Sequence, residues 1–311
     1  MLHKIRHNAR KHKHRYAIGT LIIILGLWAF FYINSGCGTN PTGERLGVGG
    51  QVEVGQISGV VRDTSGIDIS GVTVTGGGKS AVTNYQGYFS LGNVPVGDNI
   101  LVSFSKDDYV PTQQKVKLPA GGDAYMTSYL KPIGNTETVN DSMGGTVADG
   151  NGSFTIARDS LVDAGGNDVT GTYTVQFTSF DPTVTPEFNA FPGDFAGRTS
   201  AGGTDSPFET FGYVNVTVKQ DGNVLNLAPG ATAEIHIPIP ASLQSPPAST
   251  PPPDEIELWS YNETGGYWLL EGIATREGSV PNQYYRAIVS HLSWWNADQT
   301  YDTAYVSGEV I

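Results

Sequence analysis

Five large aromatic residues near the end of the chain have the chemistry of a sugar-binding surface, because flat rings stack against sugar rings. They are Trp259, Tyr261, Trp268, Trp294 and Trp295. In the predicted strand at 256–261, Ile256 and Leu258 should face the core, which directs Trp259 and Tyr261 to the opposite side. The alternative is that the rings fill the core or cover a domain interface, since large aromatic side chains are mostly buried.

A carboxylate-based glycan hydrolase is the less favoured alternative to binding. It would need two acidic side chains about 5 to 10 Å apart in an aromatic cleft. Glu257 and Glu271 are the residues that could supply them, but no motif pairs them. No Gly-x-Ser-x-Gly elbow occurs, and the single cysteine, Cys37, has no convincing base. We therefore predict a protein that is not an enzyme and has no catalytic residues.

Metal ligands are sparse. Four of the six histidines precede residue 15, which leaves His236 and His291, and zinc catalysis usually needs three protein ligands. We expect His291 to be a hydrogen-bonded residue beside Trp294, and pairing with Asp298 or Glu271 is the alternative. Structural calcium is the remaining candidate, because several oxygen-bearing side chains lie in Gly-rich turns, although such residues mostly bond their own backbone. These side chains are Asp141, Asp149, Asn151, Asp159, Asp163, Asn167 and Asp168. No cofactor is predicted.

Phosphate and nucleic-acid chemistry are disfavoured. The run Gly76-Gly77-Gly78-Lys79-Ser80 looks like the end of a phosphate-binding loop, but position 73 is Thr73 and a strand, not a helix, is predicted to follow. A hairpin turn is the better interpretation. The chain has 30 Asp and Glu against 18 Lys and Arg, and contacts to nucleic-acid phosphates need clustered basic residues.

The composition predicts an all-β chain of two β-sandwich domains. It includes 40 Gly, 18 Pro and many Val, Thr and Tyr, which is typical of short strands joined by turns. The first domain should occupy residues 56–132, where apolar residues alternate with small or polar ones at a period of two. Its seven candidate strands are 57–62, 71–75, 80–83, 88–91, 99–105, 112–118 and 124–130.

The motifs of this first domain are familiar. A GxV opening at residue 59, a GVTV strand at 71–74, a TNYQGYF turn and strand at 83–89 and a VPVG turn at 94–97 follow one another in a specific order. In this respect the domain resembles the carboxypeptidase regulatory-like domain, a transthyretin-like β-sandwich. The resemblance implies a non-catalytic accessory module of an envelope or surface protein, in a fold class associated with carbohydrate binding.

The second domain should occupy residues 133–300 with the same alternation. Val214, Val216 and Val218 alternate with Asn215, Thr217 and Lys219, which predicts a strand with one polar side. The segments 211–240, 255–274 and 289–298 resemble the exported β-domain of cartilage intermediate layer protein and its bacterial relatives. That resemblance implies a β-sandwich and names a structure more than an activity.

The first 37 residues predict a membrane anchor. Residues 1–15 form a basic tail without acids, residues 16–33 are apolar, and the remainder has 12 basic and 30 acidic residues, a formal charge of −18. By the positive-inside rule the tail is cytoplasmic and the bulk is exported. Asn34-Ser35-Gly36-Cys37 resembles a bacterial lipobox, which makes Cys37 the lipidation candidate. Because Asn34 stands where an aliphatic residue is usual, an uncleaved transmembrane signal anchor is the other interpretation.

Two further segments complete the predicted organisation. Residues 34–55 should be a flexible tether, and residues 301–311 should be either a final strand or the start of another repeat, because Tyr305-Val306-Ser307-Gly308 echoes Gln56-Ile57-Ser58-Gly59. We therefore predict a membrane-anchored, extracytoplasmic, non-catalytic protein of the cell envelope, periplasmic or on the cell surface. Its partner would be a glycan or an envelope protein. The alternative is an adhesion or assembly element without a small ligand.

Overall fold

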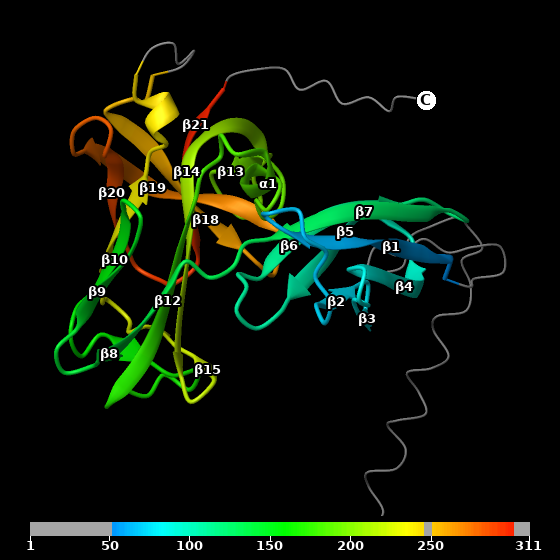
Figure 1. Ribbon diagram of the computed structural model, residues 1–311, viewed down its shortest axis with the longest axis horizontal. Coiled ribbons are helices and arrows are strands. Elements are labelled where there is room, and N and C mark those ends of the chain that lie inside the picture. Colours follow the sequence, from blue (N-terminus) through cyan, green and yellow to red (C-terminus); the bar gives the residue numbers. More distant parts are fainter. Residues whose placement is uncertain (1–51, 246–250, 302–311) are drawn as a thin grey trace, which may run out of the picture.

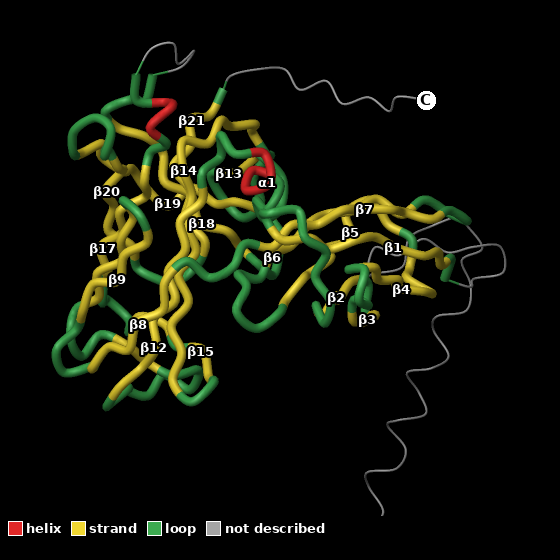
Figure 2. Tube along the Cα trace, viewed as in Figure 1, coloured by secondary structure: helices red, strands yellow, loops and turns green. Residues whose placement is uncertain are grey.

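Two β-domains lie side by side in the computed structural model, which describes residues 52–245 and 251–301 (Figures 1 and 2). The prediction of an all-β chain is confirmed: within the described ranges the helices are α1 (Thr185–Phe188) and the 3-10 helix η1 (Ala241–Leu243). No described helix has the length and apolar character to cross a membrane. The predicted basic tail, the apolar segment 16–33, Cys37 and residues 302–311 lie outside the described residues.

The first domain has the seven predicted strands in two sheets. A three-stranded sheet of order β4-β1-β7 packs against a four-stranded sheet of order β3-β2-β5-β6, and these strands run from blue through cyan to green in Figure 1. The strands are β1 (Val54–Asp63), β2 (Thr73–Gly76), β3 (Lys79–Val82), β4 (Tyr88–Pro95), β5 (Gly97–Ser105), β6 (Thr112–Leu118) and β7 (Asp123–Leu130).

Alternation along these strands places the core between the two sheets. Val102 and Phe104 of β5 are fully buried, and Phe104 meets Phe89 of the opposite sheet edge to face, with ring centroids 5.7 Å apart. The GxV opening has a steric cause, because a Cβ on Gly59 would lie 2.1 Å from the carbonyl oxygen of Met126 in the neighbouring strand. Glycine is therefore required at this position of the motif, because β1 and β7 pack closely here.

The second domain is built on one twelve-stranded sheet that folds over its own core. The main order is β8-β12-β14-β21-β18-β19-β20-β17-β10-β9, with β13 and β15 paired beside it, and β11 and β16 form a small separate sheet. The strands of the first half are β8 (Asn135–Asn140), β9 (Gly145–Asp149), β10 (Gly152–Ile156), β11 (Leu161–Val162), β12 (Thr172–Phe180), β13 (Ala196–Arg198) and β14 (Ser206–Gln220). Those of the second half are β15 (Asn223–Val224), β16 (Asn226–Leu227), β17 (Ala233–Pro238), β18 (Glu255–Asn262), β19 (Tyr267–Glu277), β20 (Tyr284–Val289) and β21 (Trp294–Thr300).

The two ends of this sheet face one another across a sandwich-like core. Phe154 and Ile235 contribute from β10 and β17, and Val175 and Val216 contribute from β12 and β14. The valines predicted to alternate in β14 point into this core, whereas Asn215 and its polar neighbours point to the other side of the sheet. That other side faces the first domain, and it positions the candidate site.

Candidate functional site

The five aromatic residues singled out from the sequence are buried, so the expectation of an exposed face for sugar stacking is wrong. Each has between 0 and 3% of its surface exposed. The predicted direction is nevertheless correct, because Trp259 and Tyr261 lie on the opposite side of β18 from Ile256 and Leu258. A second apolar cluster covers that side and contains Trp259, Tyr261, Trp268 and Trp294 together with Val110, Phe180, Ala190, Phe191, Phe208 and Tyr213, whereas Trp295 lies in the main core.

Residues 181–206, here called the crossing segment, provide much of this cover. The ring of Phe191 stacks on Trp268 with centroids 4.9 Å apart, and Trp268 donates a hydrogen bond from Nε1 to the carbonyl oxygen of Pro192 at 2.9 Å. Gly197 passes so close to Trp259 that a Cβ there would lie 2.6 Å from the indole ring. The rings therefore form an interface within the protein, as the alternative interpretation of the sequence has it.

The first domain is attached to the crossing segment through strand β6. Hydrogen bonds run from Thr112 Oγ1 to Ala190 O at 3.0 Å, from Gly193 N to Gln113 O at 2.8 Å and from Lys115 Nζ to Asp194 Oδ2 at 2.8 Å. Val110, which precedes β6, is itself a member of the aromatic cluster. Apolar packing and directional hydrogen bonds thus fix the same junction.

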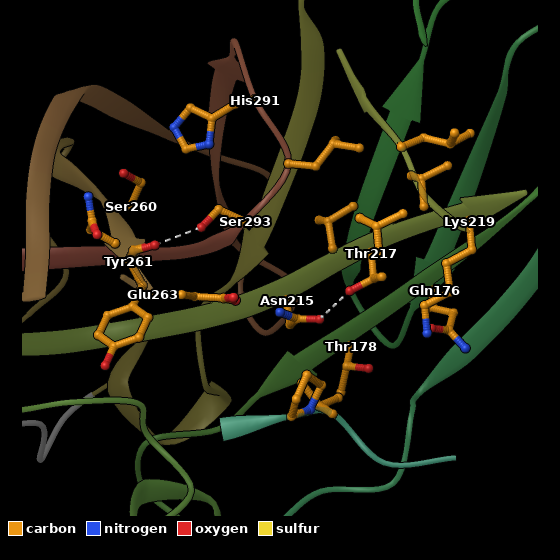
Figure 3. Close-up of a pocket in the computed structure, with 18 of the residues that line it drawn as sticks. Gln176, Thr178, Asn215, Thr217, Lys219, Ser260, Tyr261, Glu263, His291 and Ser293 are labelled. Atoms are coloured by element: carbon orange, nitrogen blue, oxygen red, sulfur yellow. Dashed lines mark hydrogen bonds between the residues drawn. The ribbon is translucent and has the colours of Figure 1, made fainter. Parts of the chain in front are cut away.

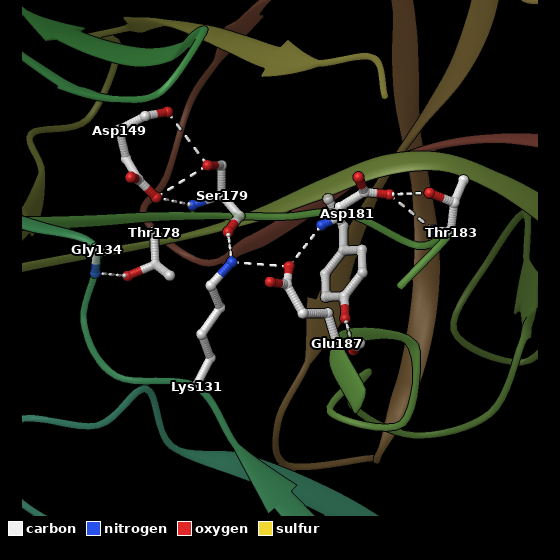
Figure 4. A network of polar contacts seen from close by, with 9 residues as sticks. Lys131, Gly134, Asp149, Thr178, Ser179, Asp181, Thr183 and Glu187 are labelled. Carbon is white, nitrogen blue, oxygen red and sulfur yellow. Dashed lines mark hydrogen bonds and ion pairs between the residues drawn. The ribbon is translucent and has the colours of Figure 1, made fainter. Parts of the chain in front are cut away.

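An ion pair adds a second attachment where the chain leaves the first domain (Figure 4). Lys131 Nζ donates to the carbonyl oxygen of Ser179 at 2.8 Å and lies 2.7 Å from Glu187 Oε2. The same carboxylate oxygen accepts a hydrogen bond from the backbone N–H of Asp181 at 2.7 Å. Both side chains of the pair are largely buried, at 20 and 17% exposure. The segment that joins the two domains is therefore held in place by these contacts.

A cleft of about 550 Å³ opens beside this junction (Figure 3). Strand β21 begins only at Trp294, so the parts of β14 and β18 beyond that point have no strand between them. The cleft occupies this region, and residues 109–111 of the first domain line it together with Ile133 of the linker. Both domains therefore contribute to one cavity.

Hydroxyl, amide and charged groups line part of the cleft, between apolar side chains such as Leu225 and Leu269. Asn215 and Thr217 come from the outward side of β14, and Thr217 Oγ1 donates to Asn215 Oδ1 at 3.2 Å. Ser293 donates from Oγ to the carbonyl oxygen of Tyr261 at 3.0 Å, and both line the cleft. The polar set is Gln176, Thr178, Asn215, Thr217, Lys219, Ser260, Asn262, Glu263, Thr264, Glu271, His291 and Ser293. Such a lining suits a ligand with many hydrogen-bonding groups.

Ser260, Glu271 and His291 meet in the cleft, but not in a catalytic order. Ser260 Oγ donates to Glu271 Oε1 at 3.0 Å, and His291 Nε2 lies 3.6 Å from that same oxygen. Of the two acids that the sequence offered as alternative partners of His291, Glu271 is the one that lies near it. The His291 ring lies against Trp295, with centroids 4.8 Å apart, next in the chain to the expected neighbour Trp294. A serine nucleophile needs the histidine as its proton acceptor. Here the carboxylate stands between the two, which favours ligand binding over nucleophilic attack.

Glu263 and Lys219 supply charge toward opposite ends of the cleft (Figure 3). Much of the Glu263 side chain is exposed, but its carboxylate is directed into the cleft, where neighbouring atoms displace water and raise its pKa. Tyr261 also lines the cleft, and burial raises the pKa of its phenol. The cleft therefore has a carboxylate at one end.

The carboxylates considered for hydrolysis are not brought together. Glu271 lines the junction cleft, whereas Glu257 lies in a separate pocket and accepts a hydrogen bond from Thr300 Oγ1 at 2.8 Å. Asp298, directly across from Glu257 in the sheet, is fully buried, and burial raises the pKa of its carboxyl well above the usual range. Asn296 and Thr210 continue this buried polar chain. A fully buried acid cannot contact a glycan.

Several of the Asx residues considered for calcium are engaged within the protein. Asp149 accepts hydrogen bonds from the backbone N–H and the hydroxyl of Ser179, and Asn151 donates one to Asn282. Asp163 accepts hydrogen bonds from the backbone N–H groups of Gly165 and Asn167 at 2.8 and 2.9 Å. Asp141 is buried, and burial together with Asp159 and Asp168 raises its pKa. Across residues 52–245 and 251–301, no group of three His, Cys, Asp or Glu side chains has the geometry to hold a metal ion.

Sequence reasoning did not single out Gln176, Thr217 and Lys219 as site residues, although they line the cleft. The available signal was the alternation in β14, where polar side chains occupy every second position on the side away from the core. Such a pattern usually marks a strand with one side in water, and it does not distinguish open surface from a cleft. Here residues 109–111 of the first domain cover this side of β14 and turn an open surface into a cleft.

Several solved structures show partial similarity to this chain. A type II cohesin–X-dockerin complex from Acetivibrio cellulolyticus is 26% identical over 25% of this chain and 58% of that chain, with a TM-score of 0.22. A protein from Bacteroides fragilis, provisionally described as membrane-associated and of unknown function, is 10% identical over 79% of this chain and 98% of that chain, with a TM-score of 0.22. A protein from Bacteroides uniformis, provisionally described as carbohydrate-binding, is 11% identical over 76% of this chain and 98% of that chain, with a TM-score of 0.21. Scores this low support no functional argument.

Comparison with curated proteins gives no match. The resemblance of the second domain to cartilage intermediate layer protein stays a prediction. Residues 56–131 match the family model of the carboxypeptidase regulatory-like domain, in agreement with the motifs of the first domain and with its two packed sheets.

Proposed function

We propose that this chain is a membrane-anchored, extracytoplasmic, non-catalytic protein that binds a glycan in the cleft at the junction of its two domains. The anchor is the apolar segment 16–33 or a lipidated Cys37, and the acidic remainder is exported. The observation that carries the proposal is the cleft itself, about 550 Å³ in volume, formed between the two domains and lined in part by hydroxyl, amide and carboxylate groups. This moves the predicted binding site away from the buried tryptophans.

The lining matches the chemistry of a sugar. Each sugar hydroxyl both donates and accepts hydrogen bonds, and side chains such as Gln176, Asn215 and Thr217 do the same. Tyr109 of the first domain adds an aromatic ring to the cleft wall. Ligand sites typically combine a concave shape with a few convergent polar groups. The position between two domains is also typical of such sites.

A non-catalytic role is supported by how the cleft's reactive groups are engaged. Ser260 donates its hydroxyl to Glu271 and not to His291, so no general base activates it. The carboxypeptidase regulatory-like domain, by its resemblance, is an accessory module without catalytic residues. Binding is therefore the activity that these groups support best.

A glycan-array screen of the full-length chain in mild detergent tests the proposal. A Gln176→Ala/Thr217→Ala variant removes two lining side chains, and a Gln86→Ala/Thr75→Ala variant makes the same changes on the exposed surface of the first domain. We expect saturable binding that the first variant weakens and the second leaves unchanged. Equal binding by all three proteins, or no binding across a broad array, would refute a glycan site in the cleft.

The second candidate is an assembly or adhesion element without a small ligand. It is favoured by the junction, where the aromatic cluster, the β6 hydrogen bonds and the Lys131–Glu187 ion pair hold the two domains in one arrangement. Two domains held in one arrangement can transmit force, and they hold a bound partner at a fixed angle. Capture of an envelope protein by the full-length chain, undisturbed in the Gln176→Ala/Thr217→Ala variant, would favour this alternative.

A further inference from the structure

One carboxylate in the junction cleft has no partner within the described protein. Glu263 forms no hydrogen bond or ion pair with any other described residue, and only the displacement of water acts on its pKa, which it raises. The carboxylate is directed into the cleft from the turn that follows β18 (Figure 3). A carboxylate that points into a cleft and has no counter-charge there attracts a cation.

The other acidic groups around the junction are already engaged. Glu271 accepts from Ser260 and lies near His291, Glu187 pairs with Lys131, and Asp194 pairs with Lys115. Lys219 lies away from Glu263, toward the other end of the cleft, and forms no ion pair with it (Figure 3). Glu263 is therefore the acidic group in the cleft that remains available to a ligand.

We infer that the cleft selects a glycan that carries a protonated amine, and that Glu263 receives this ammonium group. The inference rests on the proposed function and names the ligand class for the same site. Hydrogen bonds between an ammonium and a carboxylate are stronger than those between neutral groups. The hydroxyl and amide groups of Asn215, Thr217 and Gln176 then bind the neutral part of the sugar.

A matched pair of sugars isolates the amine. Short oligomers of β-1,4-linked glucosamine carry free amines, whereas the corresponding N-acetylglucosamine oligomers have the same linkage without the charge. We would measure their affinity for the full-length chain in mild detergent by calorimetry in mildly acidic solution, where the glucosamine amines are protonated. The buffer would contain physiological salt, which screens non-specific attraction to the acidic surface. Glu263→Gln removes the charge, and Glu255→Gln does the same at an exposed position at the opposite end of β18.

The expected result is binding of the glucosamine oligomer that is tighter than that of the acetylated oligomer by about tenfold or more, as a charge-assisted hydrogen bond provides. The preference should disappear in Glu263→Gln and persist in Glu255→Gln. Equal affinity for the two oligomers, or a preference that survives Glu263→Gln, would overturn the inference while leaving glycan binding in the cleft intact. If neither oligomer binds, the amine inference fails, and the wider glycan array decides the proposed function separately. A melting temperature close to that of the parent chain verifies that Glu263→Gln is folded.

Discussion

Trp268 of β19 donates its indole N–H to the carbonyl oxygen of Pro192, 76 residues earlier in the chain and 2.9 Å away. This hydrogen bond is buried, and the ring itself has no exposed surface. It joins the large sheet to the crossing segment, on which the first domain also packs. The side chain that looked from the sequence like a sugar platform therefore holds the architecture together.

Trp268→Ala should lower the free energy of unfolding by about 3–5 kcal/mol, the usual cost of removing a large buried aromatic side chain. The loss combines a cavity beside Phe191 with an unpaired carbonyl on Pro192. Urea unfolding followed by tryptophan fluorescence measures it. Tyr85→Ala is the control, because Tyr85 is 83% exposed and its removal should change stability by less than about 0.5 kcal/mol. Equal effects of the two substitutions would contradict the structural role of Trp268.

The alternation of residues in β18 predicted correctly on which side Trp259 lies, but not what covers that side. A period of two assigns a side chain to one face of a sheet and carries no information about a segment 60 residues earlier in the chain. The seven strands of the first domain were predictable because each depends on local alternation and turn residues. Glu263 and Gln176 were not, because their shared cleft forms only when β14, β18 and the first domain come together.

Asp298→Asn should make stability less dependent on pH. Asp298 is fully buried, and burial raises the pKa of its carboxyl well above the usual value, with the neighbouring Glu257 acting in the same direction. The folded state therefore holds a proton that the unfolded chain releases. The stability from this group is fully present below the ordinary aspartate pKa and is lost as the pH rises through the higher pKa of the folded state.

An asparagine at position 298 keeps a hydrogen-bonding donor and acceptor without an ionisable proton. We expect the variant to gain stability relative to the parent chain as the pH rises from about 4 to 8, the range above the ordinary aspartate pKa. Urea unfolding of both proteins at several pH values measures the difference. Asp123→Asn, at an exposed position in β7, serves as the matched control. Parallel stability curves for Asp298→Asn and the parent would show that Asp298 releases no proton on unfolding.

Deletion of residues 16–33 should release the chain from the membrane, because this is the only segment of the first 37 residues apolar enough to insert. Fractionation of cells that express the full-length chain and the deletion variant tests this. Cys37→Ala separates the two anchoring mechanisms: an uncleaved anchor stays in the membrane fraction, whereas a lipoprotein loses its acyl label and its processing. A deletion variant that still sediments with membranes would refute the predicted anchor.

Lys131→Met should destabilise the junction by about 1–3 kcal/mol, the cost of leaving a largely buried charged group without its partner. The lysine loses its hydrogen bond to Ser179, and Glu187 keeps only the backbone N–H of Asp181 as a donor to its carboxylate. Adding Glu187→Gln should recover part of the loss, because the orphaned charge is removed.

Lys117→Met provides the contrast, since Lys117 and Asp98 are 3.8 Å apart and more than half exposed, and a surface pair contributes less than about 1 kcal/mol. Urea unfolding of the four proteins decides the matter. If Lys131→Met behaves like Lys117→Met, the ion pair at the junction contributes no more than a surface pair, and the aromatic cluster and the β6 hydrogen bonds hold the domains together without it.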